Sequence, residues 1–225
     1  MATDLNDSTG MIEAPAIVTG SLGLGPMLKR WTTDEYHKLR EFGLIMEGAP
    51  IELIDGMLVF KDRRDSGDSE MTQGDRHALA VAQLVELNMA LAALGFHVRI
   101  QSPLSIGNRH EPEPDGVILP GRPVAYAGRL PASDDACVVI EVADTSLKYD
   151  RTVKKSMCAT AAIPAYWIVN LQDNVIELFE RPNPLSGEYD HQRIIHAREP
   201  FEVKLSEAVV LKVASGSLIA DYAGS

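Results

Sequence analysis

Residues 138–155 read VVIEVADTSLKYDRTVKK and join the most strand-like run of the chain to a segment rich in Asp and Lys. The apolar run is interrupted by one carboxylate, Glu141. An unpaired carboxylate is costly to bury, because its charge loses hydration. Glu141 therefore requires a compensating partner, which can be a cation, a metal ion or water at the end of the strand.

The residue patterns on both sides of this stretch predict a mixture of helices and strands. Helical patterns cover residues 32–43, 77–95 and 146–162, and strand patterns cover 51–60 as a hairpin, 97–106, 115–120, 136–143, 165–170, 175–180 and 191–196. Elements in this order predict a mixed α/β domain with a central sheet flanked by helices.

Local signals indicate where several of these elements begin and end. Thr32, with Glu35 three positions later, forms a capping-box signature that begins a helix. Asp55-Gly56 joins two short apolar runs and favours a tight hairpin turn. Gly95 ends the second helix, and Asp173-Asn174 can form a turn between two strands.

The chain of 225 residues is long enough for one sizeable core. Residues 1–27 are rich in Gly, Ser, Thr and Asp without a clear period, so we interpret them as a flexible N-terminal arm. We expect a single domain over residues 28–215, which includes a polar loop at 61–76, and a C-terminal tail over 216–225.

Charge and composition restrict the function classes. The net charge of −11 disfavours non-specific binding to nucleic acid, which depends on Lys and Arg, although a local basic face can still exist. No apolar run reaches the roughly 18 residues of a membrane span, and no secretory signal pattern opens the chain, so a cytoplasmic location is expected. Cys137 and Cys158 lack CxxC spacing and are expected to be buried free thiols.

Charged residues in three of the predicted elements can converge. Asp115 opens a strand directly after Pro114, and Glu141 lies near the end of the next strand. Asp150 and Lys154 are four positions apart on the following helix and therefore share a face. If the two strands are neighbours, Asp115 and Glu141 meet at the sheet edge, where they repel unless a divalent cation lies between them. Such oxygen ligands suit Mg²⁺ or Mn²⁺, and the lysine would complete a site for water beside a phosphate.

Each of these residues also has an interpretation without catalysis. Asp115 can be a turn or edge residue. Glu141 can be salt-bridged to Lys154 with no metal present. Asp150 and Lys154 can be a solvated pair on one helix face, which is the usual meaning of this spacing.

At these residues the chain resembles the PD-(D/E)XK restriction-endonuclease-like superfamily, and more closely the Uma-type family of bacterial endonucleases. The matching segments follow the family order over about residues 28–205: IELIDGMLV, RHALAVAQL, RIQSPLSIG, EPEPDGVIL, VVIEVADTS, YDRTVKKSM and IPAYWIVNLQDNVIELFERP. The Pro114-Asp115 pair and the YDRTVK…IPAYWIVN block are the most specific of them.

The resemblance implies that Asp115 is the first acid of the motif and Glu141 the second, both of them metal ligands. The usual lysine, two positions after the second acid, is Ala143 here. The resemblance implies that this lysine has moved to the next helix, where Lys154 matches the family's YDR-x-x-K. Glu52 matches a further family acid and is expected to be an extra metal ligand, a partner of Lys154, or merely an exposed hairpin residue.

Further positions match the family less specifically. His77 matches, although a histidine at a helix N-terminus is more often structural. Arg151, beside Asp150, can contact a nucleic-acid backbone or can be an exposed helix charge. Cys158 stands where the family often has Tyr. Ala162 stands where the family often has Gly, and an Ala in a left-handed helix cap costs about 1 kcal/mol.

The function implied by the resemblance is a metal-dependent endonuclease acting on DNA, with Mg²⁺ or Mn²⁺ as cofactor. Lys154 would orient or deprotonate the attacking water and offset charge on the phosphate. The alternative is a catalytically inactive binding or assembly module that keeps the fold, and a third candidate acts on RNA or a nucleotide. A homodimer is expected only by analogy with nucleases that cut two strands with two copies.

Overall fold

A computed structural model of the chain describes residues 28–61 and 70–219. Its centre is a mixed six-stranded sheet with the strand order β3-β4-β5-β6-β7-β8. The strands are β3 Phe96–Ile100, β4 Gly116–Pro120, β5 Val138–Ala143, β6 Ala165–Asn170, β7 Val175–Asn183 and β8 Glu188–His196. Only β5 and β6 pair in parallel, while the other neighbours in this sheet are antiparallel.

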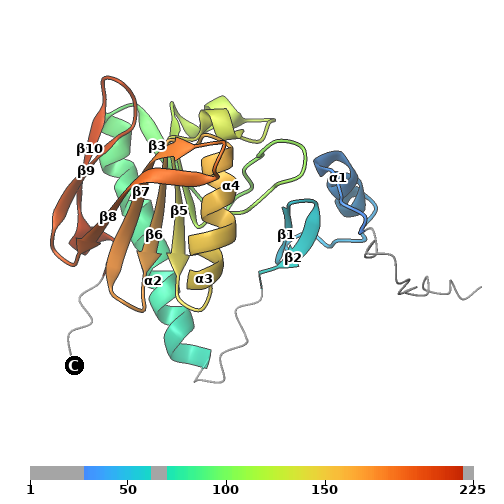
Figure 1. The fold of residues 1–225 in the computed structure, drawn as a ribbon, viewed down its shortest axis with the longest axis horizontal. Helices are drawn as coiled ribbons and strands as arrows, with labels where there is room; N and C mark the ends of the chain where they lie inside the picture. Colours follow the sequence, from blue (N-terminus) through green and yellow to red (C-terminus); the bar gives the residue numbers. More distant parts are fainter. Residues whose placement is uncertain (1–27, 62–69, 220–225) are drawn as a thin grey trace, which may run out of the picture.

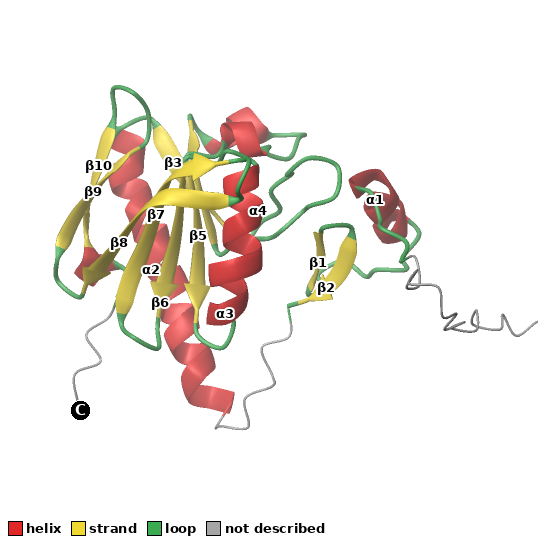
Figure 2. Ribbon diagram, viewed as in Figure 1, coloured by secondary structure: helices red, strands yellow, loops and turns green. Residues whose placement is uncertain are grey.

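Helices cover both faces of this sheet. The long helix α2 (Glu70–Ala93) lies behind one face, and α3 (Leu147–Tyr149) and α4 (Lys155–Thr160) cross the other (Figure 1). The helical connection between β5 and β6 is what allows these two strands to run parallel. The predicted mixed α/β sheet with flanking helices is therefore confirmed, as the colouring by secondary structure makes visible (Figure 2).

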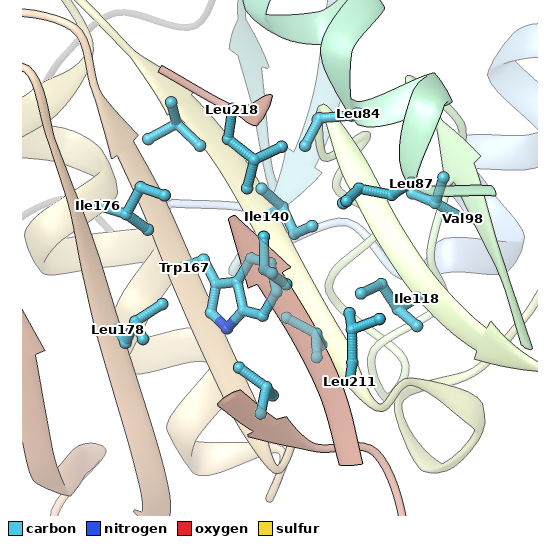
Figure 3. Packing of buried hydrophobic residues seen from close by; sticks show 14 of the residues in the cluster. Leu84, Leu87, Val98, Ile118, Ile140, Trp167, Ile176, Leu178, Leu211 and Leu218 are labelled. Atoms are coloured by element: carbon cyan, nitrogen blue, oxygen red, sulfur yellow. The ribbon is translucent and has the colours of Figure 1, made fainter. Parts of the chain in front are cut away.

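Two apolar clusters hold the layers together. On the α2 side, Trp167 is fully buried among side chains such as Ile140 and Leu211 (Figure 3). The Trp167 ring meets Phe201 edge to face at a centroid distance of 5.4 Å. On the α4 side, a second cluster contains Tyr166 from β6. Because β5 and β6 are buried on both faces, their sequences are nearly continuous apolar runs.

A second hairpin, which we did not predict, completes the α2 side of the core. It consists of β9 (Pro200–Lys204) and β10 (Val210–Ala214). Alternate residues such as Val203 and Leu211 are buried, while charged residues such as Glu202 face outward. The alternation of buried and exposed residues is visible in the sequence, but we did not recognise it.

The N-terminal elements form a separate small unit at the right of Figure 1. It contains α1 (Thr33–Glu41) and the hairpin of β1 (Ile51–Ile54) and β2 (Met57–Phe60). The predicted capping box of Thr32 and Glu35 is present, and the predicted Asp55-Gly56 turn has positive φ at both residues. The unit is anchored to the loop before β4 by hydrogen bonds between the backbones of Leu53 and Glu111.

Three predicted boundaries differ from the structure. α2 begins at Glu70, so the part of the predicted loop at 70–76 is helical, while residues 62–69 lie outside the described residues. The strand predicted over 97–106 stops at Ile100, because Gln101 has a φ of 41° and turns the chain. The helix predicted over 146–162 contains a π-helical turn, Asp150–Lys154, between α3 and α4.

Other local predictions are confirmed. Gly95 follows α2 with a φ of 82°, and Asn174 turns between β6 and β7 with a φ of 55°. Ala162 takes the left-handed conformation after α4, with a φ of 56°. Cys137 and Cys158 are free thiols as predicted, but only Cys158 is buried, whereas Cys137 is partly exposed.

The predicted domain limits remain predictions. The arm at 1–27 lies outside the described residues. The core continues past residue 215, because Leu218 and Ile219 are both buried in it. In the two ranges that the structure describes, no helix combines the length and the apolar character needed to cross a membrane.

Candidate active site

The sheet register brings Asp115 and Glu141 together. In the antiparallel pair of β4 and β5, Gly116 lies opposite Ile140. One step further along this register, Asp115 lies opposite Glu141. Opposed residues of an antiparallel pair share one face of the sheet, and here that face is the one covered by α3 and α4. Two acids that are 26 positions apart in the sequence therefore meet at one end of the sheet.

Asp115 is held in place by several donors. Its Oδ2 accepts a hydrogen bond from the backbone amide of Val142 at 2.9 Å and lies 3.2 Å from Nε2 of His77. Its Oδ1 accepts a bond from the side-chain amide of Gln101 at 3.3 Å. These contacts come from β5, α2 and the end of β3, and they fix the carboxylate at the junction of three elements.

Lys154 supplies the cation that Glu141 requires. Its Nζ lies 2.9 Å from Oε1 of Glu141 and 3.5 Å from Oε1 of Glu52. Glu52 is 2% exposed and accepts a hydrogen bond from the backbone amide of Glu113 at 2.7 Å. Glu52 is therefore a buried partner of Lys154 rather than an exposed hairpin residue.

The π-helical turn explains how a helix delivers the lysine to this point. π-helical turns are rare and are frequent at functional sites, because the wider turn re-aims its side chains. Asp150 and Lys154 are the first and last residues of the turn, and both are buried. Asp150 accepts a bond from Ser146 Oγ at 2.6 Å, and its carbonyl accepts one from the Tyr166 hydroxyl at 3.0 Å. Asp150 and Lys154 are thus not a solvated pair on the protein surface.

Three acids, Glu52, Glu141 and Asp150, surround the amine of Lys154. Burial raises the pKa of Glu141 to about 8, and Lys154 opposes this rise only in part. Burial likewise raises the pKa of Asp150. For Lys154, burial alone would lower the pKa, but Glu141, Glu52 and Asp150 outweigh burial and raise it. The lysine therefore stays protonated, and the cluster would be stabilised by a further positive charge.

The two neighbouring cationic side chains, Arg151 and Lys155, form ion pairs with acids outside this cluster. Arg151 forms a two-pronged ion pair with Glu177 on β7, with its Nη2 2.6 Å from Oε1, rather than pointing freely into solvent. Lys155 pairs with Glu188 at 2.6 Å and lies over the ring of Phe179. Of the two adjacent lysines, only Lys154 reaches the acid cluster.

Several residues of the site were missed in the sequence. Gln101 and Lys61 reach the acids from loop positions whose sequence carries no catalytic pattern, and Lys61 Nζ lies 3.5 Å from Oε1 of Glu52. Glu177 is buried in the middle of a predicted strand, as Glu141 is, and the same reasoning would have found it. The positive φ of Gln101 could not be foreseen, because it comes from packing rather than from a turn-forming residue type.

The donor set can be compared with the needs of metal ions. Throughout the described ranges, no group of three or more His, Cys, Asp or Glu side chains has the spacing of a metal cage. Mg²⁺ needs no such cage, since it keeps several waters and is bound through one or two carboxylates together with substrate phosphates. The buried acids Asp115 and Glu141 fit that less demanding pattern.

Comparisons with known proteins identify the family and the fold. Residues 33–214 match the family model described as Uma2, putative restriction endonuclease. Among solved structures, the chain is similar to one described as a putative nuclease belonging to DUF820 from Anabaena variabilis, with a TM-score of 0.57 and 12% identity over 83% of this chain and 96% of that one. At this identity the likeness shows a shared fold alone. No curated protein matches the chain.

Proposed function

The chain belongs to the Uma2 family of putative restriction endonucleases, and we propose from this premise that it is a metal-dependent endonuclease hydrolysing DNA phosphodiester bonds. One observation carries the proposal: Lys154 of the π-helical turn lies 2.9 Å from Glu141, which the sheet register sets opposite Asp115. Two acids and an amine at one point are the minimal set for metal-assisted attack of water on a phosphate.

The absence of a lysine two positions after Glu141 is compatible with this function. Ala143 occupies that position, is fully buried and packs against the cluster on the α4 side. Lys154 reaches the same point from the adjoining helix, so the amine is supplied from a different part of the chain.

Asp115 and Glu141 would hold Mg²⁺ or Mn²⁺, since carboxylate oxygens are the ligands these ions prefer. A bound ion would polarise a phosphate oxygen and lower the pKa of a bound water. His77 and Val142 hold the Asp115 carboxylate in one orientation. A ligand that is already oriented costs less entropy when it binds.

Lys154 would act as a proton-bearing electrostatic residue in this reaction. Since neighbouring carboxylates raise its pKa, it retains its proton, so it can donate a hydrogen bond to the attacking water and offset charge on the phosphate. Glu52, fixed by the amide of Glu113, is a second ionic partner that would keep the amine near the site if Glu141 held a metal ion.

Nicking of supercoiled plasmid with Mg²⁺ or Mn²⁺ tests this function. We expect nicking by the wild-type protein, loss of at least about a hundredfold in rate for Lys154→Ala, and little change for the control Lys155→Ala, whose lysine pairs with Glu188 instead. Absence of nicking by the wild type, or equal nicking by Lys154→Ala, would refute the assignment. Circular dichroism of both variants separates lost chemistry from lost folding.

A second candidate, a catalytically inactive module with the same fold, is favoured by the charge of −11 and by the engagement of the acids with donors from the protein itself. Calorimetric titration with Mn²⁺ distinguishes the two. A catalytic site should bind the ion and lose it in Asp115→Asn, whereas an inactive module should bind none in either form.

A further inference from the structure

Gln101 extends the row of polar residues on which the candidate site is built. In the antiparallel pair of β3 and β4, Ile100 lies opposite Gly116, so the next step of this register sets Gln101 opposite Asp115. The backbone amide of Gln101 follows this register, since it donates to the carbonyl of Asp115 at 3.2 Å. Asp115 in turn lies opposite Glu141. The ends of three adjacent strands therefore place a glutamine and two acids side by side.

The side chain of Gln101 reaches the nearer of these acids. Its Nε2 donates to Oδ1 of Asp115 at 3.3 Å, while Oδ2 of Asp115 accepts from the amide of Val142 and lies 3.2 Å from Nε2 of His77. Gln101 thus acts on a different carboxylate oxygen from the other two residues. A carboxylate oxygen accepts in two directions, so an amide hydrogen bond in one direction is compatible with a metal ion in the other.

The backbone of Gln101 is strained. Its φ of 41° lies in the left-handed region, which is uncommon for residues other than glycine, asparagine and aspartate. Ser102 Oγ closes the turn by donating to the carbonyl of Ile100 at 2.8 Å. A glycine would adopt the same φ without strain. Strained residues of this kind cluster at functional sites, so a strained glutamine in contact with Asp115 points to a role of its side chain.

The contact between Gln101 and Asp115 contributes little to the stability of the fold. Its length of 3.3 Å exceeds the usual N–H···O distance of about 2.9 Å, and Gln101 itself is exposed. A long hydrogen bond at the surface is weak, so it offsets at most part of the strain. Orientation of a metal ligand is a different matter, because loss of a residue that holds such a ligand typically weakens metal binding about ten- to a hundredfold.

We propose that Gln101 is a positioning residue of the metal site: it orients Oδ1 of Asp115 toward the ion, and its strained backbone is retained for this contact. The inference rests on the proposed metal-dependent function and adds a residue to that site. Gln101 acts through Asp115 rather than on the substrate. Removal of its amide should therefore weaken metal binding, whereas relief of its strain should stabilise the fold. These two effects have opposite signs, which separates positioning from a merely structural role.

Calorimetric titration of the full chain with Mn²⁺, together with urea unfolding in EDTA, tests the proposal. Gln101→Met keeps the length of the side chain and the strained backbone but loses the amide. It should weaken Mn²⁺ binding at least about tenfold and leave the urea midpoint within about 0.2 M of the wild type. Gln101→Gly should weaken Mn²⁺ binding equally but raise the midpoint by about 0.2–0.5 M, because glycine relieves the strain.

Two variants outside the site are matched controls. Gln192→Met makes the same replacement at an exposed glutamine of β8, the opposite edge strand of the sheet, and should change neither Mn²⁺ binding nor the midpoint. Ala162→Gly relieves a positive φ after α4 and should raise the midpoint without changing Mn²⁺ binding. Unchanged or tighter Mn²⁺ binding in Gln101→Met, a lower midpoint in Gln101→Gly, or a wild type that binds no Mn²⁺ would each overturn the proposal.

Plasmid nicking separates this inference from the proposed function. For a positioning residue, the loss of rate in Gln101→Met should be large at limiting Mn²⁺ and shrink to less than about threefold at saturating Mn²⁺, whereas Lys154→Ala should stay impaired at both. A loss in Gln101→Met that persists at saturation would overturn the positioning role. If Gln101→Met weakens Mn²⁺ binding but the wild type nicks no plasmid, the nuclease function is refuted and the role of Gln101 in the metal site stands.

Discussion

Replacement of Glu141 by glutamine should change how stability depends on pH. The substitution keeps the shape of the side chain but removes its ionisation. In the folded protein, burial raises the pKa of Glu141 from 4.5 to about 8. Between these two pH values, the folded state holds a proton that the unfolded state has released. The free energy of unfolding of the wild type therefore falls as pH rises through this window.

The size of the effect follows from the two pKa values. One pKa unit corresponds to about 1.4 kcal/mol, so the interval from 4.5 to about 8 corresponds to about 5 kcal/mol at most. This contribution is fully present below pH 4.5 and is lost above about pH 8. Allowing for relaxation around the ionised group, we expect the wild type to lose about 2–5 kcal/mol relative to Glu141→Gln between pH 5 and pH 9.

Urea unfolding at 25 °C in EDTA, repeated at several pH values from 5 to 9, measures this difference. The two proteins should have similar unfolding free energies near pH 5, and the variant should be the more stable at pH 9. In a parallel series without EDTA, addition of Mn²⁺ should stabilise the wild type more than the variant, because the ion favours the ionised carboxylate.

A difference between the two proteins that stays constant from pH 5 to pH 9 would refute this reasoning. So would a variant that is less stable than the wild type by about 3–5 kcal/mol at pH 9, since that is the result expected when one partner of a favourable buried ion pair is removed.

Three further substitutions test the packing around the site by urea unfolding. Ala162→Gly should raise the unfolding free energy by about 1 kcal/mol, because glycine adopts the φ of 56° without strain. A loss of stability would contradict the view that Ala162 is strained in its left-handed conformation. Arg151→Gln should cost about 1–2 kcal/mol, because the buried Glu177 loses its guanidinium and keeps only the hydrogen bond from Asn170. The control Lys155→Gln, whose partner Glu188 is exposed, should cost less than about 1 kcal/mol, and equal costs would refute the distinction. Gly116→Ala should cost about 1–3 kcal/mol, because the added Cβ would lie 3.2 Å from a methyl group of Leu84 on α2. An unchanged urea midpoint would show that Leu84 moves aside without cost.

Local chemistry made much of the fold predictable. The Asp55-Gly56 turn, the capping box at Thr32 and the cap at Ala162 depend on the backbone preferences of a few adjacent residues. The apolar runs of β5 and β6 reflect burial on both faces. These local patterns also made it possible to predict the order of helices and strands and the need of the buried Glu141 for a partner. The small hairpin of β9 and β10 was missed, although its alternation of apolar and charged residues is present in the sequence.

Only the tertiary structure decided which residues meet. The sequence names Asp115, Glu141 and Lys154 as candidates, but the register of β4 on β5 and the π-helical turn bring them to one point. The burial of Glu52 depends on the docking of the first hairpin against a loop some 60 residues away, and no local pattern carries that information. Strand pairing and docking are selected by the packing of distant segments, so the electrostatic partners of a buried charge are fixed only when the whole chain has folded.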